Sequence, residues 1–311
     1  MRKEHQKQEH TNSYYAATAN EISNYPVLEG AQSADVCVVG AGFTGVATAL
    51  TLAERGFSVA LVEANRVGWG ASGRNGGQLI NGISGLGKIA KQRGSDYDDM
   101  LWALKWRGND IVYDRVEKYG IQCDLKTGFL EVAAKPSHLA YFDEFVAERE
   151  KHEHPYPYEV WDRETTRANL GTDAFHGGFV CYRDGHLHPL NLCLGEARAA
   201  HDLGVRIFEQ SPVSDIEHGN RPRVKTATGH VDANAVVLAG NAYGQFEPKH
   251  LSNLVFPAGS YIIGTEPLSE EVVGEINPKD VAVCDTNEVV DYYRLSADKR
   301  LLYGGACNYS G

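Results

Sequence analysis

One short stretch carries residues whose types and spacing could bind a dinucleotide. Gly40, Gly42 and Gly45 form a GxGxxG pattern, and Glu63 follows them. In this pattern the first glycine permits a tight turn, the second lets the backbone approach a pyrophosphate, and the third lets a helix pack closely on a strand. A carboxylate at Glu63 can accept hydrogen bonds from ribose hydroxyls, and its charge would repel a 2′-phosphate. These residues predict a dinucleotide site.

The elements that must position these residues are also present in the sequence. The apolar, β-branched run 34–39 predicts a strand, the amphipathic run after Gly42 predicts a helix, and 58–63 predicts a second strand. A helix that begins at the turn points free N–H groups and the positive end of its dipole at the phosphates. GxGxxG alone is a weak signal, but here the strand, the helix and the acidic residue accompany it.

A second glycine-rich stretch, 70–77, follows directly after the ribose-binding strand. Glycine carries an entropic cost and offers nothing to pack, so the stretch suits a backbone that lies against a flat ligand. Ser72, Arg74 and Asn75 add hydrogen-bond donors for an anionic pyrophosphate. A mobile surface loop is the alternative, and the position after the strand favours ligand contact.

Composition narrows the class of protein. The 311 residues are 42% hydrophobic and 23% charged, as in an ordinary globular protein of one or two domains. The net charge of −11 argues against a nucleic-acid partner. No apolar run is long enough to span a membrane, and residues 1–20 lack a secretory signal. The six cysteines show no metal-ligand spacing, and His186 and His188 are interpreted as structural, so we expect a cytoplasmic protein with no metal.

Further sequence patterns predict a long helix and several strands. Residues 96–119 predict a long helix, in which Trp102 and Trp106 are interpreted as packing residues. The apolar run 235–242 is typical of a buried parallel strand, whose end would bring Gly240 close to a cofactor. The runs 261–265, 292–295 and 301–305 predict strands of a second sheet.

The two glycine-rich stretches and Glu63 together resemble the flavoprotein amine and amino-acid oxidases of the D-amino acid oxidase and glycine oxidase group. Within that group, the runs 13–20 and 69–85 are most similar to the gamma-glutamylputrescine oxidases of bacterial putrescine catabolism. The similarity extends from about residue 13 to residue 311. It implies an α/β fold, α+β overall, in which a Rossmann-type FAD-binding domain is interleaved with a sheet-based substrate domain.

The resemblance also implies a division of the chain. By their own composition, residues 1–33 are expected to form an N-terminal arm, disordered over 1–11, with Tyr14 and Tyr15 packed on the body. Segments 34–119 and 186–245 would form the FAD-binding domain, and 120–185 and 246–311 the substrate domain. Members of the group then return to the FAD-binding domain with a closing strand, turn and helix, which this sequence does not contain. A truncated, inactive flavoprotein fragment is therefore one alternative.

The cofactor implied is a noncovalent FAD, and the amine substrate would bind in a pocket for which Tyr261, Tyr293 and Arg294 are candidates. Val213 would offer its backbone N–H and C=O to the adenine. The residues expected to contact FAD are Gly40, Gly42, Phe43, Thr44, Gly45, Glu63, Ala64, Gly70, Ala71, Ser72, Arg74, Asn75, Gly76, Gly77, Gln78, Leu79, Val213 and Gly240.

The activity implied is oxidation of the C–N bond of an amine by hydride transfer to the flavin. Gamma-glutamylputrescine would give an aldehyde, ammonia and, with oxygen as the acceptor, hydrogen peroxide. A neutral amine needs no general base, so no catalytic residue is named, and the oligomeric state is left open. One alternative is an oxidase or dehydrogenase of a small amino acid, such as glycine, sarcosine or a D-amino acid, with Arg294 holding the substrate carboxylate. A nicotinamide-dependent dehydrogenase is another, but it leaves the glycines of 70–77 unexplained.

Overall fold

The computed structural model describes residues 8–22, 24–83, 85–94, 97–153, 156–243 and 258–308. The predicted disorder of residues 1–7 and the substrate-domain residues predicted at 246–257 and 309–311 lie outside these ranges. The chain divides into two compact units. The first unit contains Met1–Asn75, Tyr119–Cys123 and Pro189–Pro257, and the second contains Gly76–Lys118, Asp124–His188 and Ala258–Gly311.

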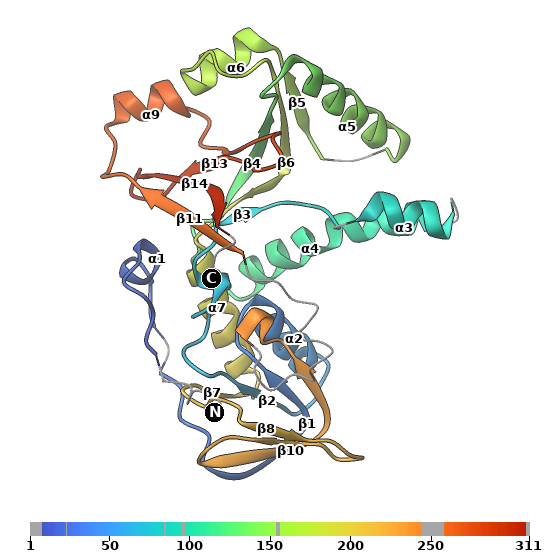
Figure 1. Ribbon diagram of the computed structural model, residues 1–311, viewed down its shortest axis with the longest axis vertical. Coiled ribbons are helices and arrows are strands. Elements are labelled where there is room, and N and C mark those ends of the chain that lie inside the picture. Colours follow the sequence, from blue (N-terminus) through green and yellow to red (C-terminus); the bar gives the residue numbers. More distant parts are fainter. Residues whose placement is uncertain are drawn as a thin grey trace. The chain divides into compact units, whose positions relative to one another are not determined.

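A six-stranded sheet organises the first unit (Figure 1). In spatial order the strands are β7 (Arg206–Phe208), β2 (Val59–Val62), β1 (Gly30–Val39), β10 (Gly229–Leu238), β9 (Arg223–Lys225) and β8 (Asp215–Glu217). In this sheet β7, β2, β1 and β10 are parallel to one another, and β9 and β8 are added by antiparallel pairing.

Two helices accompany this sheet. Helix α2 (Phe43–Glu54) packs on β1 and β2, and α7 (Pro189–Asp202) packs on α2. The short α1 (Tyr14–Ala17) buries Tyr15, as expected. The N–H of Gln8 donates to Asn65 Oδ1 over 3.0 Å, so the prediction of disorder is wrong at this residue.

The second unit contains an eight-stranded mixed sheet. Strands β4 and β12 run parallel, and the other pairs are antiparallel. The strands predicted at 292–295 and 301–305 are confirmed, and they pair antiparallel with each other. The spatial order is β11 (Gly259–Gly264), β14 (Leu301–Asn308), β13 (Tyr292–Leu295), β12 (Ala282–Asp285), β4 (Lys126–Val132), β6 (Gly178–His186) and β3 (Gln78–Leu79), with β5 (Tyr158–Trp161) also paired to β6.

Successive side chains of a strand point to opposite faces of the sheet. Apolar side chains therefore lie on both faces of the second sheet, and helices pack on each of them. Leu130 of β4 packs with Leu170 of α6 (Arg163–Leu170) on one face. Phe179 of β6 packs on the other face with Trp106 of α4 (Asp98–Lys118) and Phe142 of α5 (Leu139–Lys151). The other helices in the described ranges are α3 (Leu86–Arg93), α9 (Glu270–Ile276) and the 3₁₀ turns η1 (Ala71–Gly73), η3 (Pro136–His138) and η4 (Asn241–Tyr243).

The predicted fold class, a Rossmann-type sheet combined with a second sheet-based unit, is confirmed. Residues 76–118 differ from the predicted division, because they cluster with the second unit and not with the first. The reason is that β3 pairs with β6 and Trp106 lies in the core of the second unit.

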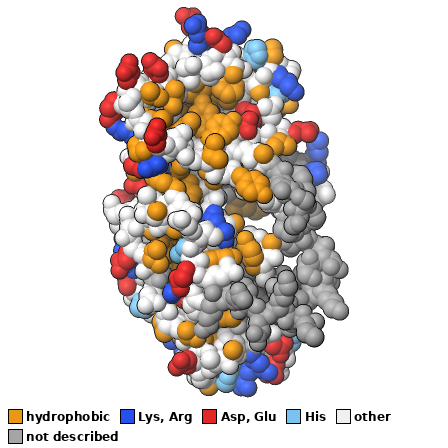
Figure 2. Space-filling view, turned by 60° about the vertical axis from the view of Figure 1, so that its left-hand side comes forward, with side chains coloured by type: hydrophobic (Ala, Val, Ile, Leu, Met, Phe, Trp, Pro, Cys, Tyr) orange, Lys and Arg blue, Asp and Glu red, His pale blue; other side chains and the backbone are white. Residues whose placement is uncertain are grey.

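The surface of the second unit carries hydrophobic side chains, which the upper half of Figure 2 shows. On β11, the side chains of Tyr261 and Ile263 are 59% and 68% exposed. None of the helices in the described ranges is long and apolar enough to cross a membrane.

Candidate dinucleotide site

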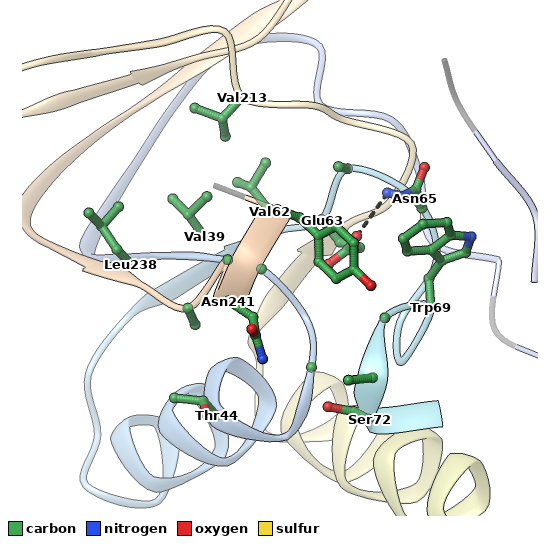
Figure 3. Close-up of a pocket in the computed structure, with 18 of the residues that line it drawn as sticks. Val39, Thr44, Val62, Glu63, Asn65, Trp69, Ser72, Val213, Leu238 and Asn241 are labelled. Carbon is green, nitrogen blue, oxygen red and sulfur yellow. Dashed lines mark hydrogen bonds between the residues drawn. The ribbon is translucent and has the colours of Figure 1, made fainter. Parts of the chain in front are cut away.

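A cavity of about 350 Å³ lies in the first unit, at the carboxyl ends of β1, β2 and β10 (Figure 3). This edge of a parallel sheet is where doubly wound α/β folds bind their ligands. Its walls are Val39, Gly40, Gly42, Phe43, Thr44, Val62, Glu63, Ala64, Asn65, Trp69, Gly70, Ala71, Ser72, Pro212, Val213, Leu238, Ala239, Gly240, Asn241 and Tyr243.

The glycine turn has the geometry that its sequence predicts. Gly40 has φ +102°, and a Cβ on it would lie 2.6 Å from the carbonyl oxygen of Ala239. A Cβ on Gly45 would lie 1.8 Å from the carbonyl oxygen of Gly40, so any larger residue would push the helix off the strand. Gly45 therefore shapes the turn without lining the cavity.

The N-terminus of α2 opens into this cavity. Gly42, the N-cap residue, has no side chain to cap the helix, and Ser72 Oγ instead accepts a hydrogen bond from the N–H of Phe43 at 2.9 Å. Gly42, Phe43 and Thr44 all line the cavity, so the positive end of the helix dipole faces it. Such an end binds phosphate groups.

Glu63 stands on the cavity wall just after β2, and Figure 3 shows its bond with Asn65. Its Oε2 accepts from the N–H of Ala41 at 2.7 Å, and its Oε1 accepts from the N–H of Asn65 at 2.9 Å. Burial raises the pKa of the Glu63 carboxyl above its usual range, although these two N–H groups act in the opposite direction. A carboxylate held in this position can accept hydrogen bonds from the hydroxyl groups of a ligand.

A buried ion pair supports the loop behind Glu63. The carboxylate of Glu209 is fully buried and accepts from Arg66 Nη1 at 2.9 Å, from the N–H of Val67 at 2.8 Å and from the N–H of Tyr25 at 3.1 Å. Arg66 also pairs with Glu9. These bonds fix the chain that leads from β2 to the glycine-rich stretch.

Two of the predicted donors brace that stretch and do not line the cavity. Arg74 Nε donates to the carbonyl oxygen of Trp69 at 3.0 Å, and its guanidinium lies 4.6 Å from the centre of the Trp69 ring. Asn75 Nδ2 donates to the carbonyl oxygens of Ala71 and Ser72. Contact of either residue with a cofactor stays a prediction.

Residues 76–79 belong to the second unit and lie against β13 and its neighbours. Arg294 Nε donates to the carbonyl oxygen of Gly76 at 2.7 Å, and a Cβ on Gly76 would lie 2.7 Å from the ring of Tyr292. Gln78 Nε2 donates to the carbonyl oxygen of Val283. The second sheet thus holds this glycine-rich backbone in place.

The three substrate-pocket candidates have different surroundings. Tyr261 is 59% exposed. Tyr293 packs on the hydrophobic core of the second unit, with its ring stacked on Tyr303 at 5.9 Å. Arg294 is buried and bonded to backbone carbonyls. Their role in substrate binding stays a prediction.

Sequence reasoning missed several lining residues, most of which come from loops. Trp69 and Tyr243 meet edge to face at 5.6 Å, and Asn65 and Pro212 line the cavity with them. Of these four residues, Trp69 is the one that the sequence could have indicated, because it directly precedes the glycine-rich stretch 70–77. In the described part of the chain, no group of three or more His, Cys, Asp or Glu side chains could hold a metal.

Comparisons with known proteins agree with this geometry. Residues 35–311 match the family described as FAD dependent oxidoreductase. The chain is 45% identical to probable oxidoreductase OrdL of Haemophilus influenzae, over 96% of this chain and 70% of the relative. It is 43% identical to gamma-glutamylputrescine oxidoreductase of Escherichia coli, over 97% of this chain and 71% of the relative.

Solved structures share the fold. Glycine oxidase from Geobacillus kaustophilus superposes with a TM-score of 0.66 at 20% identity, over 90% of this chain and 73% of that one. Glycine oxidase from Bacillus cereus superposes with a TM-score of 0.68, also at 20% identity, over 89% of this chain and 72% of that one.

The fold and the glycine turn are those of a dinucleotide-binding protein. The family match and the relatives make the assignment definite: this chain belongs to the FAD-dependent oxidoreductase family of the D-amino acid oxidase type, and its cofactor is FAD.

Proposed function

We propose that the chain is an FAD-dependent amine oxidase whose substrate is gamma-glutamylputrescine. The observation that carries this proposal is the 43% identity to the Escherichia coli gamma-glutamylputrescine oxidoreductase over 97% of the chain. The small amino acid oxidases among the solved structures are only about 20% identical, a level that supports the fold and not the substrate.

We further propose that the cavity of the first unit holds the adenosine diphosphate half of FAD. The residues fit this group because Gly40 and Gly42 leave room for a backbone approach, and the N-terminus of α2 supplies donors for the pyrophosphate. Glu63 would receive the ribose hydroxyls, and Val213 would border the adenine. Bound FAD supplies a hydride acceptor for C–N bond oxidation.

The residues of the second unit would place the substrate and exclude water. Arg294 donates to the carbonyl oxygen of Gly76, the Tyr292 ring packs against Gly76, and Gln78 donates to the carbonyl oxygen of Val283, so the second sheet supports this backbone. A rigid wall keeps the reacting carbon oriented, which lowers the entropic part of the barrier. Because the amine would bind deprotonated, no side chain is assigned as a general base.

A substrate panel tests the proposal. The purified, FAD-loaded chain is assayed for hydrogen peroxide with gamma-glutamylputrescine, putrescine, glycine, sarcosine and D-alanine. We expect kcat/KM for gamma-glutamylputrescine to exceed that of every other compound by about 100-fold or more, since an unfilled charged subsite costs several kcal/mol. Higher kcat/KM with a small amino acid would overturn the substrate assignment.

A further inference from the structure

A second cavity, of about 170 Å³, lies inside the second unit, where β4 and β6 face α4 and α5. Its walls combine three phenylalanines with two carboxylates and two cations. The lining residues are Ile80, Asn81, Lys105, Phe129, Glu131, Phe145, Arg149, Phe179, Cys181 and Asp184.

Two of the four charges are already paired by the protein. Asp184 accepts from the N–H of Asn81 at 2.8 Å, from Asn81 Nδ2 at 2.5 Å and from Asn109 Nδ2 at 2.7 Å. Lys105 forms an ion pair with Glu148 at 2.9 Å. These two groups therefore have a structural role, in which Asp184 fixes the position of Asn81.

The other two charges, Glu131 and Arg149, are incompletely bonded. Within the described residues no hydrogen bond reaches the Glu131 carboxyl, and burial raises its pKa to about 7. Arg149 is only 4% exposed, and its Nε has no hydrogen-bond partner among the described residues. Its Nη1 donates to the carbonyl oxygen of Phe145, and its guanidinium lies 4.5 Å from the centre of the Phe179 ring. Arg149 is buried and Glu131 is half-buried, and a buried polar group needs a partner, which a ligand in this cavity can supply.

The cavity is lined by both negatively and positively charged side chains, and this combination limits the kind of ligand that it could bind. A simple anion would meet the carboxylates of Glu131 and Asp184, and a simple diamine would meet Arg149 and Lys105. A group that carries both an ammonium and a carboxylate satisfies both sides. The apolar rings of the walls would accept the methylenes next to such a group.

We propose that this cavity is a subsite for the charged head of an α-amino acid, with its ammonium on Glu131 and its carboxylate on Arg149. The inference rests on the proposed function, because gamma-glutamylputrescine carries this head at its glutamyl end and a primary amine at the other. It adds a specificity determinant, since putrescine has no such head.

The course of the chain supports this subsite. Ile80 and Asn81 line the cavity and directly follow β3, whose Gln78 and Leu79 we propose to lie beside the flavin. Two residues span at most about 7 Å of chain. A long substrate could therefore keep its head in the cavity while its amine reaches the reacting position.

The test measures binding and not turnover alone. The probe is gamma-glutamylethylamide, which has the glutamyl head and lacks the terminal amine, titrated calorimetrically into the FAD-loaded chain without oxygen. In Glu131→Gln, which removes the charge at nearly constant volume, we expect Kd to rise about 10-fold or more. Glu144→Gln, an exposed change on α5, is the matched control and should leave Kd unchanged.

A second measurement uses the same probe with its α-amine acetylated, which removes the positive charge that Glu131 is proposed to bind. The acetylated probe should bind the unmutated chain about 10-fold more weakly, and Glu131→Gln should bind both probes equally. No binding of the probe to the unmutated chain, or an equal Kd for the unmutated chain and Glu131→Gln, would overturn the subsite. If gamma-glutamylputrescine is not oxidised but the probe still binds through Glu131, the proposed function fails and the subsite stands. If the substrate is oxidised with an unchanged KM in Glu131→Gln, the subsite fails and the function stands.

Discussion

Replacing Glu131 with glutamine should stabilise the ligand-free chain at pH 8 and not at pH 4. Burial raises the carboxyl pKa from 4.5 to about 7, so the folded state retains a proton that the unfolded chain releases. Stability contributed by the protonated group is fully present below pH 4.5 and is lost as the pH rises to about 7. One pKa unit corresponds to about 1.4 kcal/mol, so the loss at pH 8 is at most about 3.5 kcal/mol. The neutral amide of the Glu131→Gln variant carries no charge and escapes this loss.

Urea unfolding followed by tryptophan fluorescence measures this effect. Three of the four tryptophans, Trp102, Trp106 and Trp161, lie in the second unit, so the signal reports mainly on the unit that contains Glu131. The unfolding midpoint of the variant should exceed that of the unmutated chain at pH 8 and equal it at pH 4. An equal gain at both values would mean that packing and not charge is responsible. A less stable variant at pH 8 would show that Arg149 and Lys105 compensate the carboxylate fully, contrary to the reasoning.

Three further predictions concern the first unit. Gly42→Val should abolish FAD retention, because a Cβ would lie 2.8 Å from Ser72 Oγ and its methyl groups would fill the pyrophosphate space; an unchanged flavin-to-protein ratio would refute this. Glu63→Ala should weaken FAD affinity by roughly 1–3 kcal/mol, the cost of losing hydrogen bonds to a charged group, and fluorescence titration with an unaltered Kd would remove the ribose assignment. Arg66→Ala should lower the free energy of unfolding by about 3 kcal/mol, because the fully buried Glu209 carboxylate loses its cation. Arg223→Ala should cost less, because its partner Asp232 is only half-buried and stays in contact with water; similar urea midpoints for the two variants would contradict this difference.

The nucleotide half of the fold could be predicted because local rules determine it. Gly40 needs a positive φ and Gly45 needs the absence of a Cβ, so the spacing alone specifies the turn and the helix contact. For these glycines the choice of residue follows from the conformation and packing of the backbone at that position, so the sequence alone reveals it. The apolar run 235–242 predicts a buried parallel strand, and the structure pairs residues 235–238 of β10 in parallel with β1. The predicted burial is wrong, because Ala235 is exposed and Val236, Val237 and Leu238 are only half-buried.

The rest of the site depends on contacts between distant segments. Trp69 and Tyr243 meet across the cavity although they are far apart in sequence. Arg294 is predicted as a possible substrate ligand, and no local pattern reveals that its side chain donates to the carbonyl oxygen of Gly76, 218 positions away in the sequence. The second cavity was not predicted either, because Glu131 lies in a strand whose burial is set by two helices.

The central claim, flavin-dependent oxidation of gamma-glutamylputrescine, is tested most directly by the visible spectrum of the FAD-loaded 311-residue chain during anaerobic addition of this compound. We predict a yellow protein whose flavin absorbance is bleached by gamma-glutamylputrescine and is unchanged by glycine or sarcosine at the same concentration. A flavin that is bleached by glycine or sarcosine and not by gamma-glutamylputrescine would contradict the account, as would a chain that binds no FAD.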